Sequence, residues 1–418
     1  MKKYETVIIG GGAAGILAAI SAARAGRSAI ICEKMPQLGK KILASGNGRC
    51  NLLNNNLRPE YYNPEARGLV ATVFNKFGKK EILDFFTALG LRTYSREGRI
   101  FPVTNQAASV MKVLEMELQR LSVPLEFNFN CSAVSVSPAG IIVSSPDGKE
   151  VSGTKVIITG GGKTYPAFGS DGSIYGVARA LGHTIIEPAP CAVPLVVKDN
   201  LCFLLQGQRI PACVRSVIDS KAGEPVPGEL LFTKYGLSGT CILDVSEEIS
   251  LALHRQHKSD ISLAVDMVPF MKKDELQDIL SRRRKEKVAP EDMLAGILPN
   301  KFGRILRSIP ENNDVDAIIS SLKERCFKVD GTRGWNEAEF TAGGVDVNEV
   351  DPETLESRLK KNVYFAGEVL DVNGKRGGYN LTWAWASGWV AGSADSSPPA
   401  RLAQNDIVEQ KITAWRSQ

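Results

Sequence analysis

Apolar runs and glycines alternate at the start of the chain in a pattern that predicts a strand, a helix and a second strand. Residues 6–9 are apolar and β-branched and end at glycine, as a buried strand does. Residues 13–25 are rich in alanine and close at Gly26, which predicts a helix, and residues 28–32 form a second apolar run that ends at Glu33. A strand–helix–strand unit of about 30 residues implies a parallel sheet with a right-handed crossover.

The rest of the first half mixes helical and strand patterns. Residues 34–56 are rich in glycine and asparagine and carry little periodicity, so we interpret them as a functional loop. Helical periodicity predicts helices at 64–77, 79–89 and 107–121. Strand patterns follow, with alternating runs at 125–136 and 140–145 around a turn at 137–140, a hairpin turn at 146–148 and a very apolar strand at 155–159.

The second half changes character twice. Short β-type runs separated by Pro, Gly and Asp predict an antiparallel β domain between residues 188 and 266. Residues 272–324 are helical in pattern, with prolines at 290, 299 and 310 as breakers. The chain then returns to an α/β pattern, with a strand at 362–366, a helix at 379–394 and a proline-rich tail beyond Ser396 that we expect to dock loosely.

Composition and charge narrow the class of protein. The chain has 418 residues, 43% of them hydrophobic and 23% charged, as in a globular protein of two or three domains. Its formal net charge of +5 is too weak to indicate nucleic acid as the main partner, and the basic run at 282–287 is interpreted as a solvated helix face. No run approaches the ~20 apolar residues of a membrane span, and glycines interrupt the signal-like N-terminal segment. We expect a soluble protein that does not bind a membrane.

The eight cysteines and three histidines indicate neither a disulfide framework nor a metal site. No C-x-x-C pair occurs, so reduced thiols in the cytoplasm are expected. His183, His254 and His257 form no metal-ligand pattern, and we expect no metal. Cys50 lies in the segment 34–56 that we interpret as a functional loop. A redox thiol is one interpretation of this residue, and a plain structural thiol is the favoured one.

The N-terminal unit carries the motif Gly10-x-Gly12-x-x-Gly15 between its first strand and its helix. Gly10 permits the tight turn, Gly12 lets the backbone approach a pyrophosphate, and Gly15 lets the helix pack on the strand, while the helix N-terminus stabilises the phosphate charge. Glu33 ends the second strand, where a carboxylate accepts both ribose hydroxyls of an adenosine. The pattern predicts a bound dinucleotide, and this acid disfavours the 2′-phosphate of NADP at the site.

The C-terminal region favours FAD over NAD. Residues 363–368 form an apolar strand ending in Gly367 and Glu368, and a carboxylate there can hold ribitol hydroxyls. The segment Gly377-Gly378-Tyr379-Asn380 then opens a helix, whose N–H groups are expected to face the N1–C2=O edge of a flavin and to stabilise the charge of its reduced form. Both ends of the chain are therefore expected to form one FAD site.

Several motifs, in one order from Val7 to Gly392, resemble those of the HI0933-like flavoprotein family, also described as NAD(P)/FAD-dependent or aminoacetone-oxidase-like oxidoreductases. The matching segments are residues 40–51, Thr159-Gly160-Gly161, and residues 169–172, 341–345, 365–371 and 377–381. The resemblance implies an α/β fold with three parts. A Rossmann-type FAD-binding domain of the two-dinucleotide-binding type comprises residues 1–190 and 340–418. An inserted antiparallel β-barrel-like domain comprises residues 191–270 and 325–339, and a small helical domain comprises residues 271–324.

The resemblance also implies FAD contacts from residues far apart in the chain, including Val134 through its backbone beside the adenine. Combined with the motifs above, the expected cofactor-binding residues are Gly10, Gly12, Ala13, Ala14, Gly15, Glu33, Lys34, Lys41, Gly46, Arg49, Cys50, Asn51, Val134, Thr159, Gly160, Gly161, Gly367, Glu368, Gly378, Tyr379, Asn380 and Leu381. No catalytic acid or base is assigned, because the flavin itself carries the electron chemistry.

This sequence departs from the family pattern at two places on the expected substrate side. Residues 232–240 contain Lys234-Tyr235 where relatives often carry His followed by another residue, and Lys375-Arg376 precedes Gly377 where a smaller or uncharged residue is usual. The aromatic residues of the last predicted helix, Trp383 and Trp385 among them, are interpreted as packing residues.

The predicted function is that of an FAD-dependent oxidoreductase that acts on a small organic substrate and exchanges electrons with NAD(P)H or oxygen. Relatives implied by the resemblance oxidise amines or reduce carbon–carbon double bonds. No second complete G-x-G-x-x-G unit occurs, since Pro166 follows Gly160-Gly161-Gly162, so NAD(P)H is expected to bind transiently over the flavin. Two alternatives remain open: a flavin-dependent RNA-modifying enzyme, which a dense basic surface with exposed aromatics would support, and a non-catalytic flavin-binding sensor. The oligomeric state is left open.

Overall fold

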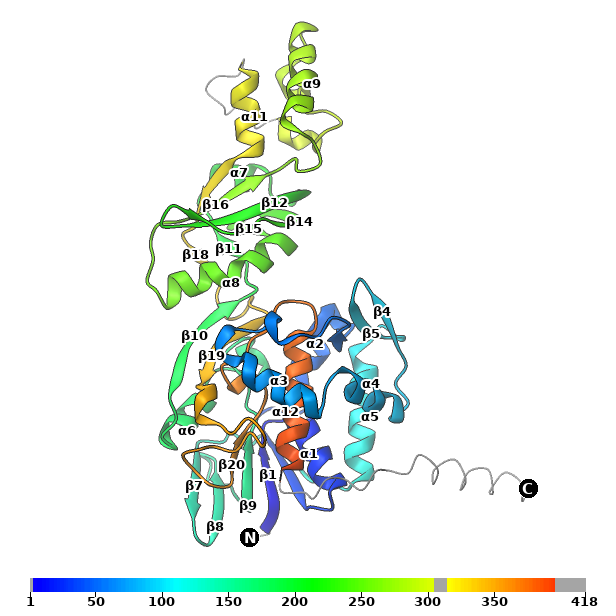
Figure 1. The fold of residues 1–418 in the computed structure, drawn as a ribbon, viewed down its shortest axis with the longest axis vertical. Helices are drawn as coiled ribbons and strands as arrows, with labels where there is room; N and C mark the ends of the chain where they lie inside the picture. The colour runs from blue at the N-terminus through cyan, green and yellow to red at the C-terminus, as the bar shows by residue number, and fades with distance from the viewer. Residues whose placement is uncertain (1–2, 304–313, 395–418) are drawn as a thin grey trace, which may run out of the picture.

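The computed structural model describes residues 3–303 and 314–394 and stacks them in three tiers. In Figure 1 the lower tier holds both ends of this described chain, the middle tier holds an antiparallel sheet, and the upper tier holds two helices. Two large apolar cores correspond to this division. One joins residues from Val7 to Leu181 with residues from Val345 to Ala394, and the other lies between Leu195 and Val329.

The lower tier is built on a seven-stranded sheet in which the predicted strand–helix–strand unit is confirmed. Strand β1 pairs in parallel with β2 and β9, with Ile8 opposite both Ile31 and Ile157. The strand order is β6-β2-β1-β9-β8-β7, with β20 also parallel to β9, and β7, β8 and β9 form an antiparallel meander around the two predicted turns. The strands are β1 Lys3–Ile9, β2 Ala29–Glu33, β6 Leu125–Phe127, β7 Ala133–Ser137, β8 Gly140–Ser144, β9 Glu150–Ile158 and β20 Val363–Phe365.

Helix α1 packs on the centre of this sheet, and α12, from the opposite end of the chain, packs on α1. Helix α1 and helix α12 lie side by side, and the alanines of α1 leave room for close packing (Figure 1). Trp383 and Trp385 of α12 are fully buried, as the packing interpretation requires. The helices of this tier are α1 Ala13–Arg24, α2 Lys40–Gly48, α3 Arg67–Lys76, α4 Lys79–Ala88, α5 Ala107–Arg120, α6 Ile174–Ala180 and α12 Tyr379–Ser393, with short 3-10 turns at Pro59–Tyr61, Pro64–Ala66, Pro166–Phe168, Val347–Glu349 and Gly367–Val369.

Two expectations for this tier were wrong in detail. The segment 34–56 is not a continuous loop, because it contains α2 and the short strand β3 Leu53–Asn54. Helix α2 is stabilised by packing on α5, a contact that local periodicity does not reveal. The alternating run at 125–136 is split, since β6 pairs with β2 whereas β7 pairs with β8. Strand β3 joins a small sheet with β4 Thr93–Arg96 and β5 Arg99–Pro102.

The middle tier is the predicted antiparallel β region, connected to the lower tier through the pair β10 and β19. Its sheet has the order β17-β16-β12-β14-β15-β11-β18, with β13 on β12. The strands are β10 Ile185–Cys191, β11 Leu195–Val196, β12 Arg209–Ile218, β13 Lys221–Ala222, β14 Val226–Thr233, β15 Gly236–Ser238, β16 Ile261–Asp266, β17 Arg325–Lys328, β18 Gly331–Thr332 and β19 Phe340–Val345.

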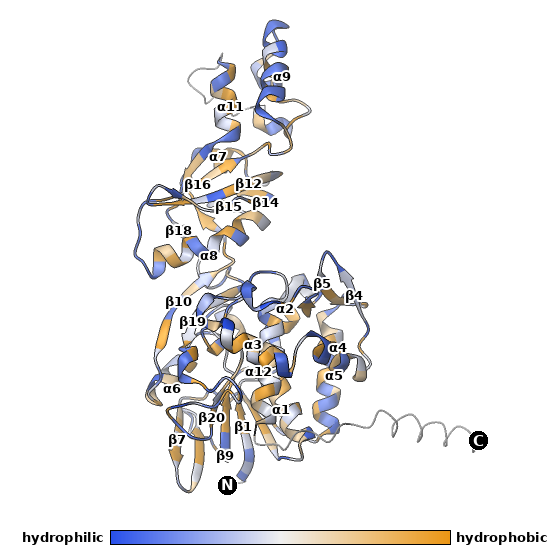
Figure 2. Ribbon diagram, viewed as in Figure 1, coloured by the Kyte–Doolittle hydropathy of each residue, from blue (hydrophilic) through white to orange (hydrophobic). Residues whose placement is uncertain are grey.

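The interpretation of residues 188–266 as β runs alone was wrong, because two helices lie within them. Helix α7 spans Asn200–Leu204, and helix α8 spans Thr240–His254 at the base of the middle tier, where it packs on β12 and β14. Figure 2 shows apolar and polar residues mixed along α8, and Ile242, Val245 and Ile249 belong to the core of the middle tier. Asp244 and Glu247 of the same helix contact residues of the lower tier.

The upper tier consists of α9 Lys273–Lys285, α11 Val315–Lys323 and 3-10 turns at Pro290–Asp292 and Asn300–Phe302. Arg282 and Arg284 at the end of α9 are exposed, as a solvated helix face requires. The proline at 310 and the tail beyond Ser396 lie outside the described residues. The α/β fold class is confirmed, and the three-part domain boundaries stay a prediction that the two cores support.

Candidate functional site

The turn between β1 and α1 has the geometry of a phosphate-binding loop. Gly10 adopts a φ of 103°, and its carbonyl oxygen sits so close to Gly15 that any Cβ on Gly15 would overlap it. The Thr159 hydroxyl supports the same turn by donating to the carbonyl oxygens of Ile9 and Gly10 at 2.8 and 2.9 Å. A Cβ on Gly12 would meet nothing within 4 Å, because Gly12 faces an open pocket. The backbone is therefore shaped for close approach by a ligand at Gly12.

The adenosine end of this pocket is defined by Glu33. Its Oε2 accepts a hydrogen bond from the Gly11 N–H at 2.5 Å and its Oε1 accepts one from the Met35 N–H at 2.7 Å. Burial raises the pKa of the Glu33 carboxyl, and the two backbone hydrogen bonds oppose that rise. Ser170 also lines the pocket, and its buried hydroxyl lacks a hydrogen-bond partner within the described residues. Both groups suit the hydroxyl-rich ribose of a dinucleotide.

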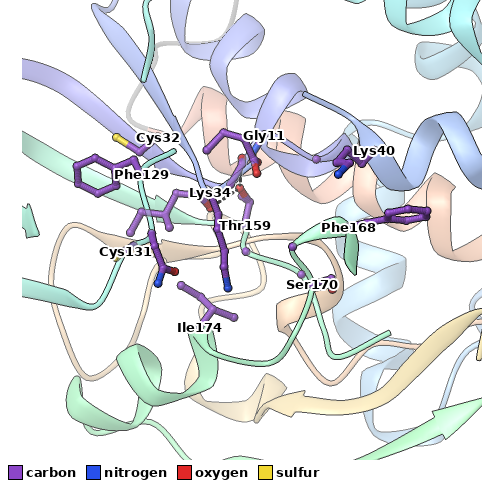
Figure 3. A pocket seen from close by; sticks show the side chains of 18 of the residues that line it. Gly11, Cys32, Lys34, Lys40, Phe129, Cys131, Thr159, Phe168, Ser170 and Ile174 are labelled. Carbon is purple, nitrogen blue, oxygen red and sulfur yellow. Dashed lines mark hydrogen bonds between the residues drawn. The ribbon is translucent and has the colours of Figure 1, made fainter. Parts of the chain in front are cut away.

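Figure 3 shows this pocket with side chains from four segments of the chain around it. Lys34 forms an ion pair with Asp171 at 2.5 Å across its mouth. On the opposite side Phe129 and Cys131 form the wall where the adenine of a dinucleotide is expected. Val134, expected beside the adenine, lies just beyond this wall and does not line the pocket.

Glu368 is the centre of a polar network beyond the phosphate turn. It forms an ion pair with Lys41 at 2.5 Å and accepts hydrogen bonds from the Thr341 N–H at 2.8 Å and the Thr164 hydroxyl at 3.2 Å. The structure thus brings Lys41 and Glu368 together from positions 327 residues apart. Direct contact of Lys41 and Glu368 with the FAD ribitol stays a prediction, because Lys41, Thr164 and the Thr341 N–H already bind the Glu368 carboxylate.

The segment before α12 forms the flavin end of the site. Gly377 and Gly378 have φ values of 122° and 103°, so this entry to the helix needs glycine. The Asn380 side chain holds the backbone of Gly374 from both sides, donating to its carbonyl oxygen and accepting from its N–H at 2.8 Å each. Asn380 therefore offers only its backbone to a cofactor. Asn51 Oδ1 lies beside Gly378, is buried, and lacks a partner within the described residues, as an acceptor awaiting a ring N–H would.

The remaining predicted cofactor residues are distributed around these two ends. Gly46 lies at the kink within α2 and Arg49 directly follows this helix, and both are exposed. Leu381 is half-buried on α12, and Gly367 packs against Ala14. Cys50 is completely buried, and burial raises the pKa of its thiol to about 12. Such a thiol stays protonated, which supports the structural interpretation of Cys50 over the redox one.

The site fits an extended dinucleotide with a second ring system at its far end. The features that fit it are the phosphate turn, Glu33, the polar atoms without partners and the α12 entry. The sequence profile of the HI0933-like protein Rossmann domain matches residues 4–394. The chain belongs to the HI0933-like family. FAD is its cofactor, and the protein is an FAD-dependent oxidoreductase.

Relatives of this HI0933-like protein include enzymes with two different named substrates. A 3-dehydro-bile acid delta(4,6)-reductase of Clostridium scindens is 37% identical over 407 residues, covering 94% of this chain and 99% of the relative. A ribosomal RNA dihydrouridine synthase of Escherichia coli is 29% identical over 406 residues, covering 93% and 97%. A 3-ketosteroid delta1-dehydrogenase of Sterolibacterium denitrificans superposes with a TM-score of 0.50 at 13% identity over 94% of this chain and 99% of that one, a likeness of fold.

A cation–aromatic band that sequence reasoning missed runs from the lower to the middle tier of the HI0933-like protein. Its pairs are Lys40 with Phe168, Lys163 with Trp335 and Arg333 with Tyr235, with cation-to-ring distances of 5.7, 4.8 and 4.3 Å. Tyr165 connects them, since its ring stacks on Phe168 at 5.4 Å and its N–H donates to the Trp335 carbonyl oxygen at 3.1 Å. The band draws on four segments far apart in the chain, so no local motif predicts it.

The described residues also bear on two expected absences, that of a metal ion and that of a membrane span. Within residues 3–303 and 314–394, His, Cys, Asp and Glu side chains form no group of three or more that could hold a metal ion. In the same ranges, no helix is both long enough and apolar enough to cross a bilayer. The cytoplasmic location stays a prediction.

Proposed function

We propose that this protein takes electrons from NAD(P)H onto its FAD and uses them to saturate a carbon–carbon double bond conjugated to a carbonyl group. The named activities of its relatives share that chemistry, because a 3-dehydro-bile acid carries a keto group beside its Δ4,6 double bonds and dihydrouridine is uridine with its ring double bond saturated. We favour a small unsaturated ketone as the substrate, since the bile-acid reductase has the higher identity of the two.

The observation that carries this proposal is the arrangement at the α12 entry. Backbone N–H groups after Gly378 and the unsatisfied Asn51 Oδ1 lie together where the flavin pyrimidine ring is expected. The partial positive charge of a helix N-terminus stabilises an anion, and reduced flavin carries its negative charge at that edge. Bound FAD supplies hydride transfer, and the chain supports it by holding this charge.

The surroundings suggest how the donor and the proton reach the site. Between Gly160-Gly161-Gly162 and α6 the chain forms only the short 3-10 turn Pro166–Phe168, so no helix begins directly at these glycines to bind a nicotinamide dinucleotide. NAD(P)H is therefore expected to use the open face of the flavin before the substrate does. Tyr165 follows Thr164, whose hydroxyl donates to Glu368, and we propose the Tyr165 phenol as the proton donor. Burial raises the pKa of this phenol, which is protonated at neutral pH.

Anaerobic titration of the FAD-loaded protein tests this proposal. NADH or NADPH should bleach the flavin band, and a 4-en-3-keto steroid or a 3-dehydro-bile acid with Δ4,6 double bonds should restore it while gaining two hydrogens by mass spectrometry. The variant Tyr165→Phe should keep the bleaching step and slow the second step by about 10²-fold or more, the usual contribution of a positioned acid. Bleaching by amines alone, with none by either nucleotide, would make the protein an amine oxidase and contradict the proposal.

A second candidate places the double bond in a uridine of RNA. The cation–aromatic band favours it, because cationic groups beside aromatic rings bind phosphates and stacked bases. If RNA is the substrate, we expect the reduced enzyme to form dihydrouridine in ribosomal RNA that lacks this modification. The variants Lys163→Ala and Arg333→Ala should then weaken this reaction and leave the reduction of a small enone unchanged. Failure of every RNA to reoxidise the flavin would exclude this candidate.

A further inference from the structure

The five residues that lead into α12 are rich in glycine and carry two charged side chains, Lys375 and Arg376. Lys375 Nζ lies 5.4 Å from the centroid of the Tyr61 ring. Three of the residues 374–378 are glycine, and glycine loses more backbone entropy on ordering than any other residue. Asn380 holds the first of them, and Asn54 Nδ2 donates to the carbonyl oxygen of Gly377 at 3.0 Å. Between these neutral contacts lies Arg376, whose side chain is only 14% exposed.

Arg376 joins this segment to two other parts of the protein at once. Its Nε and Nη2 donate to the two carboxylate oxygens of Glu339 at 2.9 Å each, a bidentate pair with the residue that precedes β19. Its Nη1 donates to Asp244 Oδ1 of α8 at 3.0 Å. The planar guanidinium fixes direction as well as distance in such a pair, which a lysine ammonium does not.

Two further contacts run along the same face of α8. Asn373 Nδ2 donates to Glu247 Oε1 at 2.7 Å, and Arg255 Nη2 lies 3.9 Å from Asp371 Oδ1. The segment 371–376, which we call the strap, is therefore held at two points on α8, Asp244 and Glu247, and at Arg255 directly after its end. Because α8 forms the base of the middle tier, the strap joins the flavin end of the lower tier to the domain above it (Figure 1).

We propose that Arg376 is a positioning residue for the oxidoreductase reaction: it fixes the strap against α8 and Glu339, and thereby sets the α12 entry at the flavin end of the site. A residue at position 376 that cannot make these contacts would release the glycine-rich segment next to the flavin end of the site. A misplacement of about 1 Å at a reacting centre costs on the order of 10²-fold in rate. The substrate part of this inference rests on the proposed function, whereas the effect on the strap does not.

The variants Arg376→Ala and Arg376→Lys test it on the full chain. In the FAD-free protein, hydrogen–deuterium exchange of residues 371–378 and of α8 should rise for Arg376→Ala, and the FAD dissociation constant should rise about tenfold. With the FAD-loaded enzyme, kcat for the unsaturated ketone should fall by up to about 10²-fold with a smaller change in KM, because the misplaced α12 entry disturbs the reacting centre. Arg376→Lys should show smaller changes in each quantity than Arg376→Ala, because a lysine keeps one ion pair and loses the bidentate contact with Glu339.

The matched control is Arg209→Ala, which removes an arginine–glutamate pair that lies within the middle-tier sheet, between β12 and β14. It should change none of these quantities. If Arg376→Ala does not fold, Glu339→Gln and Asp244→Asn each remove one partner and should show the same changes at smaller size. Exchange and FAD affinity in Arg376→Ala equal to those of Arg209→Ala would overturn the inference, whatever substrate the enzyme proves to reduce.

Discussion

Gly12 and Gly15 lie three residues apart in the phosphate turn and are surrounded very differently. A methyl group on Gly12 meets no atom within 4 Å and its backbone is extended, whereas one on Gly15 overlaps the carbonyl oxygen of Gly10. Gly12→Ala should therefore leave the free energy of unfolding of the FAD-free protein within about 0.5 kcal/mol of wild type. It should still weaken FAD binding at least ~tenfold, because the methyl group fills the space where the pyrophosphate approaches.

Gly15→Ala is the contrasting change, expected to destabilise even the FAD-free protein by about 1–3 kcal/mol through overpacking. Urea unfolding and flavin fluorescence titration measure the two effects separately. Equal loss of stability in both variants would show that Gly12 serves the fold alone and not the cofactor.

His183 gives the protein a stability that depends on pH. Its ring is buried between Glu349 Oε2, 2.9 Å from Nδ1, and Ser357 Oγ, 2.8 Å from Nε2. Burial lowers the pKa of His183 by more than the neighbouring Glu349 raises it. The folded protein thus keeps the ring neutral while the unfolded chain takes up a proton near pH ~6.5, so this contribution is complete above that pH and is lost as pH falls below it.

The corresponding variant is His183→Gln, which keeps hydrogen-bonding groups and removes the titration. Wild type should lose unfolding free energy between about pH 7 and about pH 5, and the variant should show a smaller loss over the same interval. Urea unfolding at several pH values measures the slope. Identical slopes for the two proteins would mean that other groups control the pH dependence.

At the scale of elements, the pairing of α1 with α12 places both helix N-termini at the cofactor. The two helices approach so closely that a methyl group on Gly388 would overlap the carbonyl oxygen of Ala14, and one on Gly392 would overlap that of Ala18. Gly388→Ala should separate the helices and cost about 1–3 kcal/mol of stability. It should also weaken FAD binding, because the phosphate turn and the α12 entry would no longer have the spacing that one FAD molecule requires.

The control for this prediction is Gly68→Ala near the start of α3, where a methyl group meets no atom within 4 Å. That change should be neutral or stabilise the protein by about 0.4–1 kcal/mol, as alanine does in a compatible helical position. Thermal unfolding with and without FAD measures both variants. A Gly388→Ala protein with wild-type FAD affinity would show that the helix pair is structural only.

At the scale of the whole molecule, two separate apolar cores predict two unfolding steps. The core of the lower tier includes residues from both chain ends, and the core above it lies within the inserted segment. Ligand binding stabilises only the state that holds the ligand, by RT ln(1 + [L]/Kd), which is about 2.7 kcal/mol at a hundredfold excess over Kd. FAD should therefore raise the temperature of one calorimetric transition and leave the other in place. A single transition that shifts as a unit would show that the strap and the β10–β19 pair couple the domains completely.

The sequence by itself determined the features that depend on neighbours along the chain. The turn at Gly10 to Gly15, the acid at 33 and the glycines before α12 are local arrangements of backbone and charge, so their spacing predicted the α/β fold and an FAD site. The structure then placed Thr159, Lys41 and Glu368 around these motifs, and their contact with FAD stays a prediction.

The tertiary structure decided everything that depends on residues distant in sequence. Helix α8 escaped prediction because its short apolar stretches fit a strand as well as a helix until the sheet is there to bury them. The orphaned hydroxyl of Ser170, the Lys34–Asp171 pair and the cation–aromatic band exist only because separate loops converge. Arg376 shows the same principle, since a basic residue among glycines predicts exposure, and only the approach of α8 and Glu339 supplies the two carboxylates that bury its charge.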